Sequence, residues 1–361
     1  MGLAKGALKV LLKEAARRPY SGRVLTLGRQ DIYFTYDVLR DTARACGVPL
    51  AIPEQIVLNH KREAAAQGFI SDHSLFEVLG FSESGSMDYS DYEGASYVFD
   101  LNDSNLPDHL AEAFDVIVDG GTLEHVFHVP NALNNIFKML KTGGRVIHIL
   151  PVANYVDHGF YMFSPTLFWE FYQANKFEIN TTQVFRHTQR PDLDPWEVCD
   201  YLPGCLDPVS FGGLDDGMYS LICVATKQAD STGQAVPQQG KWLADWLAKG
   251  GRAAGGLEAR PPITAGPDAG ATRTETPAAA VAAPSAAATN GLTVSIGPSR
   301  IGRIKEMIKG TPWLYRLLLP PVRWIRSWRP SQSQPPPAPA LEPASEPLPK
   351  KGLGLKVVDR Y

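Results

Sequence analysis

Polar residues follow four strand-like segments in the first half of the chain, at the point where each segment ends. They are Gly28, Asp88, Asp100 and the pair Asp119-Gly120. Ligands of open α/β sheets bind outside the carboxyl ends of the strands. A glycine there lets a ligand approach the backbone, and a carboxylate accepts hydrogen bonds from hydroxyl groups. Loops are polar in any protein, which would explain one such residue, but four in order favour a ligand site.

Two histidines beyond the fourth of these segments could act on a substrate proton. His125 follows Glu124 in "TLEHVFHV", and His158 lies in "NYVDHGFYMFSP". A neutral imidazole accepts a proton near pH 7, so both are candidate catalytic bases. The alternative for His125 is a residue that bonds the backbone or Glu124 and holds the turn. The alternative for His158 is an ordinary loop, packed by its own aromatic residues, before a helix.

The same two segments also bear on metals and on the substrate. His125 and His128 are three residues apart, but only one carboxylate lies near them, so the sequence predicts no metal site. Around His158, the residues Asp157, Tyr161 and Phe163 could form a polar and aromatic wall for a substrate such as a sugar.

A sheet must bring these residues together, and the sequence predicts one. Strands are expected at 23–28, in "SGSMDYS", "ASYVFDLND", "FDVIVDGG" and "RVIHILP". Helices are expected in "FTYDVLRDTARACG", "PEQIVLNHKREAAAQG", "SDHSLFEVLG" (capped by Ser71), "PNALNNIFKMLKTGG" and "SPTLFWEFYQANK" (capped by Ser164). The late strands "FEINTTQVFR" and "MYSLICVATK" are close enough to pair as an antiparallel hairpin. Alternating strands and helices predict an α/β fold: a doubly wound, mainly parallel sheet with helices on both faces.

Two stretches carry a resemblance to a known family. "FDVIVDGGTLEHVF" and the following "MLKTGGRVIHILP" resemble the fourth and fifth motifs of class I S-adenosylmethionine-dependent methyltransferases, and the likeness covers about residues 20 to 227. It implies a Rossmann-like methyltransferase fold and S-adenosyl-L-methionine as cofactor. It further implies that the turn after Gly28 faces the methionine part of the cofactor and that Asp88 binds the ribose. Asp100 and Leu101 would border the adenine, and Asp119-Gly120 would line the methionine end.

A narrower likeness concerns the substrate. "SDYEGASYVFDLN" and "DHGFYMFSPTLF" resemble a bacterial subgroup of methyltransferase-like proteins that is often met in surface-polysaccharide contexts. This resemblance implies methyl transfer to a small polar acceptor, such as a saccharide or a lipid-linked glycan, in polysaccharide biosynthesis.

The first loop departs from the family pattern. Family members typically have Gly-x-Gly where this chain has Gly28-Arg29-Gln30. The Gln30 amide could point at the methionine carboxylate, and Arg29 could pair with that carboxylate as a charge-assisted fork. Alternatively, both side chains fill the pocket, and the domain is a non-catalytic scaffold tethered to a membrane surface or a partner protein.

Composition divides the chain into four parts. Residues 1–228 form the expected methyltransferase-like domain, with a helical insertion at about 35–85. Residues 229–297 are a mostly disordered linker rich in Pro, Ala and Gly, with a short helical patch at 241–250. Residues 298–330 are basic, amphipathic and aromatic, which suits either peripheral contact with a membrane or docking on protein. Residues 331–361 are expected to be a disordered tail.

Charge and cysteine usage exclude other classes of protein. The net charge of -3 gives no reason to expect nucleic-acid binding. Four cysteines without a CxxC pair suit a reducing compartment, most simply the cytoplasm. A nicotinamide oxidoreductase is the weakest alternative, because the first loop lacks GxGxxG. The sequence leaves the oligomeric state open.

Overall fold

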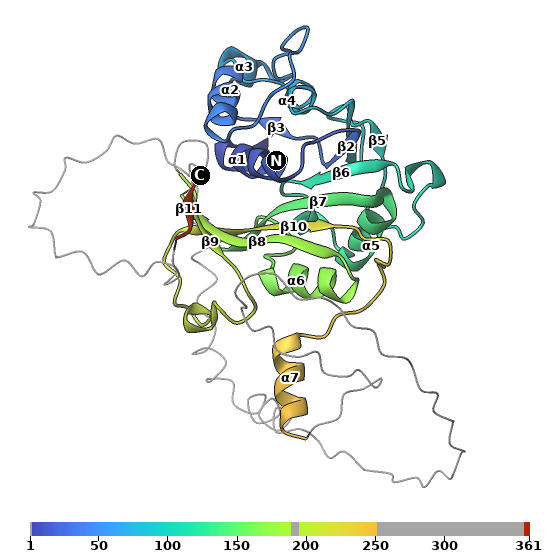
Figure 1. Cartoon of the computed structure of the whole chain (residues 1–361), viewed down its shortest axis with the longest axis vertical. Helices are drawn as coiled ribbons and strands as arrows, with labels where there is room; N and C mark the ends of the chain where they lie inside the picture. The colour runs from blue at the N-terminus through green and yellow to red at the C-terminus, as the bar shows by residue number, and fades with distance from the viewer. Residues whose placement is uncertain (1, 189–194, 251–356) are drawn as a thin grey trace, which may run out of the picture. The chain divides into compact units, whose positions relative to one another are not determined.

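The structure is a computed structural model that describes residues 2–188, 195–250 and 357–361. Its main sheet has nine strands in the order β11-β9-β8-β10-β7-β6-β2-β4-β5 (Figure 1). These strands are β2 (Arg23–Leu27), β4 (Glu83–Asp88), β5 (Tyr97–Val98), β6 (Phe114–Asp119), β7 (Leu140–Ala153), β8 (Glu178–His187), β9 (Glu197–Asp200), β10 (Met218–Thr226) and β11 (Asp359–Arg360). A second, two-stranded sheet pairs β1 (Gly2–Leu3) with β3 (Asp31–Ile32).

The direction of the strands confirms the predicted layout. The neighbours β5, β4, β2, β6 and β7 are all parallel. The strand β10 enters antiparallel between β7 and β8, so Leu221 pairs with Leu150 on one side and with Val184 on the other. The predicted mainly parallel α/β sheet with its closing antiparallel hairpin is therefore confirmed.

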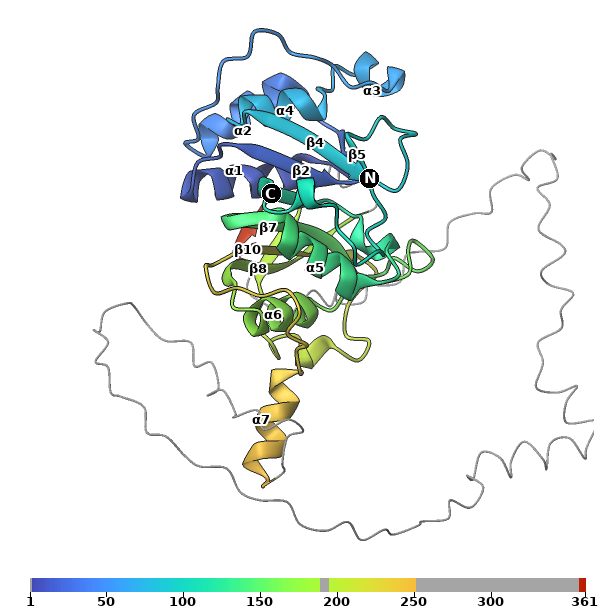
Figure 2. The ribbon, with the colours of Figure 1, turned by 90° about the vertical axis from the view of Figure 1, so that its right-hand side faces the viewer.

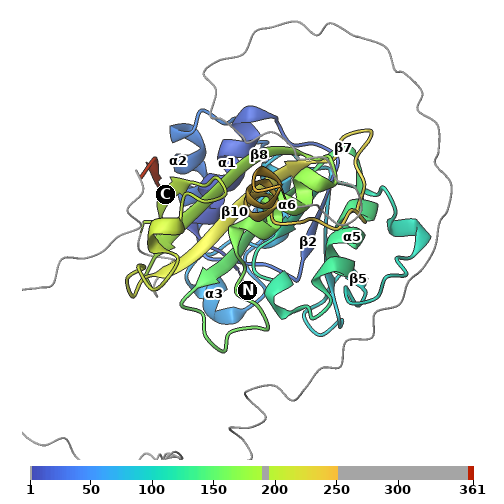
Figure 3. The ribbon, with the colours of Figure 1, turned by 90° about the horizontal axis from the view of Figure 1, so that it is seen from below.

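Helices cover both faces of this sheet. The helices that contribute to the apolar clusters on these faces are α1 (Lys5–Arg17), α2 (Tyr36–Ala45), α4 (Asp72–Val78), α5 (Val129–Met139) and α6 (Pro165–Ala174). The chain also forms α3 (Arg62–Ala66), the short 3-10 turns η1 (Asp108–Leu110), η2 (Leu123–His125) and η3 (Asp207–Val209), and α7 (Gly240–Ala248), which has no buried residue. Successive strand residues point to opposite faces, so Val24 joins an apolar cluster with α1, α2 and α4, whereas Leu25 joins one with α5 and α6. Figures 2 and 3 show these two groups of helices on opposite sides of the strands. Strands covered on both faces read as continuous apolar runs, which made them recognisable in the sequence.

Two local predictions are wrong. The helix expected over "PEQIVLNHKREAAAQG" is limited to Arg62–Ala66. Before it, Leu58 forms a β-bridge with Ile70, and Val57 accepts a hydrogen bond from the backbone of Ser71, so tertiary pairing holds this stretch extended. Ser71 caps α4 as predicted, but Ser164 precedes α6 without a capping side-chain bond.

The end of the chain also differs from the expected disordered tail. Val358 and the strand β11 pair with β9, and Tyr361 is buried. Lys13 on α1 forms an ion pair with Asp359, so the last residues contact the globular domain. The predicted helical patch after the domain is confirmed as α7. The segment 298–330 and the rest of the tail lie outside the described residues.

Two further observations concern compartment and membrane. No helix within the described ranges is long and apolar enough to cross a membrane. All four cysteines lie in the described ranges and carry free thiols.

Candidate active site at the carboxyl edge of the sheet

The first loop turns where the sequence predicts. Gly28 follows β2 with φ 66°, a conformation that favours glycine, and its backbone N–H donates to Met87 on β4. The hydroxyl of Thr122, beyond β6, donates to the carbonyl of Leu27. These bonds tie the carboxyl ends of β2, β4 and β6 together at one edge.

Gln30 lies inside this edge, where the resemblance places the methionine end of the cofactor. Its side chain is 2% exposed, and Nε2 donates to the carbonyls of Leu27 (2.9 Å) and Gly28 (3.5 Å). A Cβ on Gly120 would lie 2.7 Å from Gln30 Oε1 and 3.0 Å from Leu3 Cδ2. In this conformation the amide donors of Gln30 serve the loop, and its side chain takes the space beside Gly120.

Arg29 points elsewhere. Its guanidinium donates to the carbonyl of Glu93 and pairs with Asp72 at 3.6 Å. Both partners lie on the side of β4 rather than beside Gly120. In this conformation Arg29 is engaged with Glu93 and Asp72, and it does not fill the space that Gln30 fills.

Asp88 is the last residue of β4, and Asp100 comes shortly after β5. Asp88 Oδ1 accepts from the backbone of Tyr89, and Asp100 Oδ1 accepts from the backbone and side chain of Asn102. Both carboxylates are partly exposed. A carboxylate has two oxygens and about four lone-pair sites, so each retains capacity to accept from hydroxyl groups. Leu101 is buried in the apolar cluster that contains α5.

Asp119 has a structural role that the sequence did not indicate. It is fully buried, and its Oδ1 accepts from the backbone of Thr122 (3.0 Å) and Leu123 (3.4 Å). Its Oδ2 lies 2.7 Å from Nδ1 of His148, whose Nε2 lies 2.6 Å from the hydroxyl of Tyr172. Both oxygens are thus engaged within the protein, so Asp119 has a structural role beside the cofactor contact that the resemblance implies.

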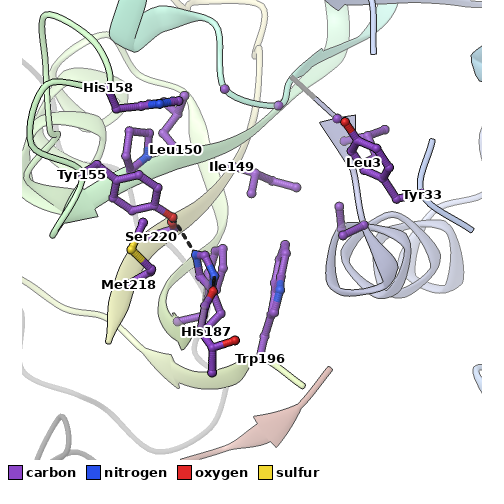
Figure 4. Close-up of a pocket in the computed structure, with 18 of the residues that line it drawn as sticks. Leu3, Tyr33, Ile149, Leu150, Tyr155, His158, His187, Trp196, Met218 and Ser220 are labelled. Atoms are coloured by element: carbon purple, nitrogen blue, oxygen red, sulfur yellow. Dashed lines mark hydrogen bonds between the residues drawn. The ribbon is translucent and has the colours of Figure 1, made fainter. Parts of the chain in front are cut away.

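A cavity of about 710 Å³ opens beside Gly120 at the same edge. Its polar lining includes Glu124, Tyr155, His158, His187 and Ser220. Figure 4 shows Tyr155, His187 and Ser220 on one side of the cavity, with Leu3 and Tyr33 from the N-terminal part of the chain across from them. Its size matches that of small-molecule sites in proteins.

Tyr155 links two groups of this lining. Its hydroxyl lies 2.6 Å from His187 Nε2 and 2.7 Å from Ser220 Oγ. His187 Nδ1 lies 2.6 Å from the carbonyl of Thr188, which can only accept, so Nδ1 carries the proton and Nε2 accepts from Tyr155. Burial lowers the pKa of His187 and raises the pKa of Tyr155 to about 12, so both groups are neutral near pH 7.

Glu124, His125 and His158 meet at the rim of the cavity. Glu124 Oε1 lies 3.9 Å from His125 Nε2 and 3.6 Å from His158 Nε2, and the two imidazole rings are 5.1 Å apart. The Glu124 side chain is 2% exposed, and burial raises the pKa of its carboxyl to about 8, with the charge of Asp119 adding to the effect. Burial also lowers the pKa of His125. The structure thus brings both predicted bases together and adds Glu124 to them.

Several solved structures match part of this chain at low identity and low TM-score. The 1,6-didemethyltoxoflavin-N1-methyltransferase of Burkholderia thailandensis, solved with bound 1,6-didemethyltoxoflavin and S-adenosylhomocysteine, is 15% identical at TM-score 0.33, covering 62% of this chain and 78% of that one. A SAM-dependent methyltransferase of Thermotoga maritima is 15% identical at TM-score 0.28, covering 61% and 89%. A phosphoethanolamine N-methyltransferase of Haemonchus contortus is 15% identical at TM-score 0.32, covering 61% and 52%. No protein-family model and no curated protein matches this chain.

The residues at this edge fit the nucleoside part of the cofactor implied by the sequence, but in this conformation they leave no space for its methionine part. Asp88 supplies a carboxylate at the strand end where the ribose is expected, and Asp100 supplies one where the adenine is expected. At the methionine end, the side chains of Gln30 and Leu3 occupy the space beside Gly120. A donor molecule could bind in full only after the Gln30 side chain has moved.

Sequence reasoning missed part of the cavity. Tyr155 follows β7, His187 ends β8, Trp196 precedes β9 and Ser220 lies on β10, and nothing in their local spacing marks them. The antiparallel hairpin was the available signal, since it places residues of β8 and β10 next to β7.

Proposed function

We propose that this chain is an S-adenosylmethionine-dependent methyltransferase whose acceptor, a small polar molecule, binds in the cavity beside Gly120. The observation that carries this proposal is the position of the cavity. It lies at the carboxyl edge of a methyltransferase-type sheet and is bordered by both Gly120 and the Glu124 and His158 side chains. When bound, the donor supplies an electrophilic methyl group.

The rim residues have a role in this proposal if the acceptor atom is oxygen. A hydroxyl must lose its proton as it attacks, and the imidazoles of His125 and His158 stand beside Glu124 at the cavity rim to receive it. Beside this cluster, where the Tyr155 ring lies 5.7 Å from the ring of His158, the Tyr155–His187–Ser220 network would fix the orientation of the acceptor through its hydroxyls. Methyl transfer is an in-line displacement, so such positioning is the main task of the protein.

The donor would be held mainly through its nucleoside. Asp88 would accept hydrogen bonds from the ribose hydroxyls, and Asp100 with Leu101 would border the adenine. Gly28 would allow the backbone to come close to the donor, and the Gln30 side chain would leave its place beside Gly120.

The finer part of the proposal concerns the acceptor and its location. The cavity combines hydroxyl, imidazole and carboxyl groups with the aromatic rings of Tyr33 and Trp196, a mixture that suits a saccharide or the sugar of a lipid-linked glycan. Such an acceptor agrees with a cytoplasmic bacterial enzyme that contacts the membrane peripherally through residues 298–330.

A second candidate function has its own support. Gln30 and Leu3 fill the space beside Gly120. The alternative proposal is therefore that the domain is a non-catalytic methyltransferase-like scaffold, tethered to a membrane surface or a partner protein. Such a domain would bind a ligand in the cavity without using a methyl donor.

Calorimetric titration of the full chain with S-adenosylmethionine and S-adenosylhomocysteine separates the two candidates. The methyltransferase proposal expects saturable binding of both, followed by transfer of a labelled methyl group to saccharide fractions. Absence of binding to the wild-type chain and to a Gln30→Gly variant would leave only the scaffold.

A further inference from the structure

Two segments that are separate in the sequence bring three potential metal ligands to one point. Glu124 and His125 belong to η2, which follows β6, whereas His158 comes from the loop that follows β7. One side-chain ligand atom from each of these residues lies within 4.8 Å of the other two. The strands β6 and β7 are adjacent and parallel, so their carboxyl ends deliver these loops to the same place.

The distances within this cluster suit a shared ion better than direct hydrogen bonds. The Nε2–Oε1 separations of 3.6 and 3.9 Å exceed the range of a hydrogen bond. Two ligands that each lie 2.0–2.2 Å from a tetrahedral zinc ion are about 3.4 Å apart. Shifts of a few tenths of an ångström, which the half-exposed rings of His125 and His158 can make, would close the difference.

The burial of Glu124 is a second, independent observation. Its side chain is 2% exposed and lines the cavity, yet its Oε2 has no hydrogen-bond partner among the described residues. A buried carboxyl oxygen without a partner costs about 1–3 kcal/mol or more, and an ion at the cavity rim would provide the missing partner.

We propose that Glu124, His125 and His158 bind one divalent transition-metal ion, most favourably Zn²⁺, at the rim of the cavity. Two imidazoles and one carboxylate are ligands for zinc and related ions rather than for Ca²⁺ or Mg²⁺. Three protein ligands leave a further coordination position. Since Glu124 and His158 line the cavity, that position is available to a molecule bound there.

This site differs from the histidine pair considered in the sequence. His128 is the next histidine along the chain, but its backbone binds the Asn102 side chain and its ring packs against Phe127. In the structure, the second histidine of the cluster is His158 and not His128. The expectation of no metal, which rested on the His125–His128 pair, did not consider this combination.

One consequence rests on the proposed function. An acceptor hydroxyl bound to the ion would lose its proton more readily, because a divalent cation lowers the pKa of a bound oxygen. The ion would then take over the task assigned above to the imidazoles, and the acceptor would be one with an oxygen free to coordinate it.

The test is metal binding by the full chain, measured without donor or acceptor. Chelator-treated protein is titrated with Zn²⁺ by calorimetry and with Co²⁺ by its visible absorption, for the wild type, Glu124→Gln, His125→Ala, His158→Ala and the control His128→Ala. We expect one ion per wild-type chain, affinity lowered by about tenfold or more in the three ligand variants, and wild-type affinity in the control. Circular dichroism of each variant shows that it is folded.

Either of two results would overturn the inference: no saturable Zn²⁺ or Co²⁺ binding by the folded wild type, or binding that His158→Ala leaves unchanged. The outcome is independent of the proposed function. A chain that binds zinc through these residues but fails to bind S-adenosylhomocysteine would retain the metal site and lose the methyltransferase assignment.

Discussion

His148 Nδ1 on β7 lies 2.7 Å from Asp119 Oδ2 at the end of β6. Both side chains are completely buried, and the His148 ring packs against the helix α6. The other Asp119 oxygen accepts from the backbone that leads into η2, where Glu124 and His125 are found. Asp119, which the sequence resemblance assigns to the cofactor, thus holds in place the loop that carries Glu124 and His125 of the candidate active site.

Replacing Asp119 should therefore destabilise the protein directly. Asp119→Ala leaves two backbone N–H groups and the His148 imidazole without their acceptor, and we expect the free energy of unfolding to fall by about 3 kcal/mol. Urea denaturation measures it, with Asp216→Ala on the exposed surface as the control. A loss no larger than that of the control would contradict the structural role.

Gln30 controls access to the space beside Gly120. Gln30→Gly removes the side chain that a donor would have to displace, together with its two hydrogen bonds, so we expect the affinity for S-adenosylhomocysteine to rise by about tenfold. Calorimetric titration measures the change. Equal affinity in both proteins would mean that the donor does not enter this space.

Asp88 tests the other end of the donor. Asp88→Ala removes the carboxylate expected to accept from the ribose, and we expect the affinity for S-adenosylhomocysteine to fall by about tenfold. Because the side chain is partly exposed, thermal stability should change little. Asp91→Ala in the loop that follows is the matched control, and the assignment is wrong if both variants bind alike.

His187 should make stability depend on pH. Burial lowers its pKa in the folded chain, whereas the unfolded chain takes up the proton at about pH 6.5. Below that pH the unfolded state binds more protons, so the stabilisation present above about pH 6.5 is lost progressively as the pH falls. His187→Gln keeps an acceptor for Tyr155 and should lose less stability between pH 7 and pH 5. If the wild type and His187→Gln gave parallel curves of unfolding free energy against pH, His187 would not have this role.

Local patterns were sufficient for the architecture. The apolar runs of β2, β6 and β7, the helices α2, α4 and α5, and the pairing of β8 with β10 were all predictable, because strand and helix periodicity and turn residues act over a few positions. The extended conformation of the residues before α3 was not predictable from local patterns, because it depends on contacts with residues around Ile70.

The sequence by itself determined the fold, the turn at Gly28 and the two histidines of the rim. Only the tertiary structure decided what the side chains at the sheet edge contact. It turned Gln30 inward against Gly120, engaged Asp119 with His148, and joined His158 to Glu124 and His125. The physical reason is that periodicity specifies which face of an element is buried. The partner of a polar side chain depends instead on which distant loops share the same edge.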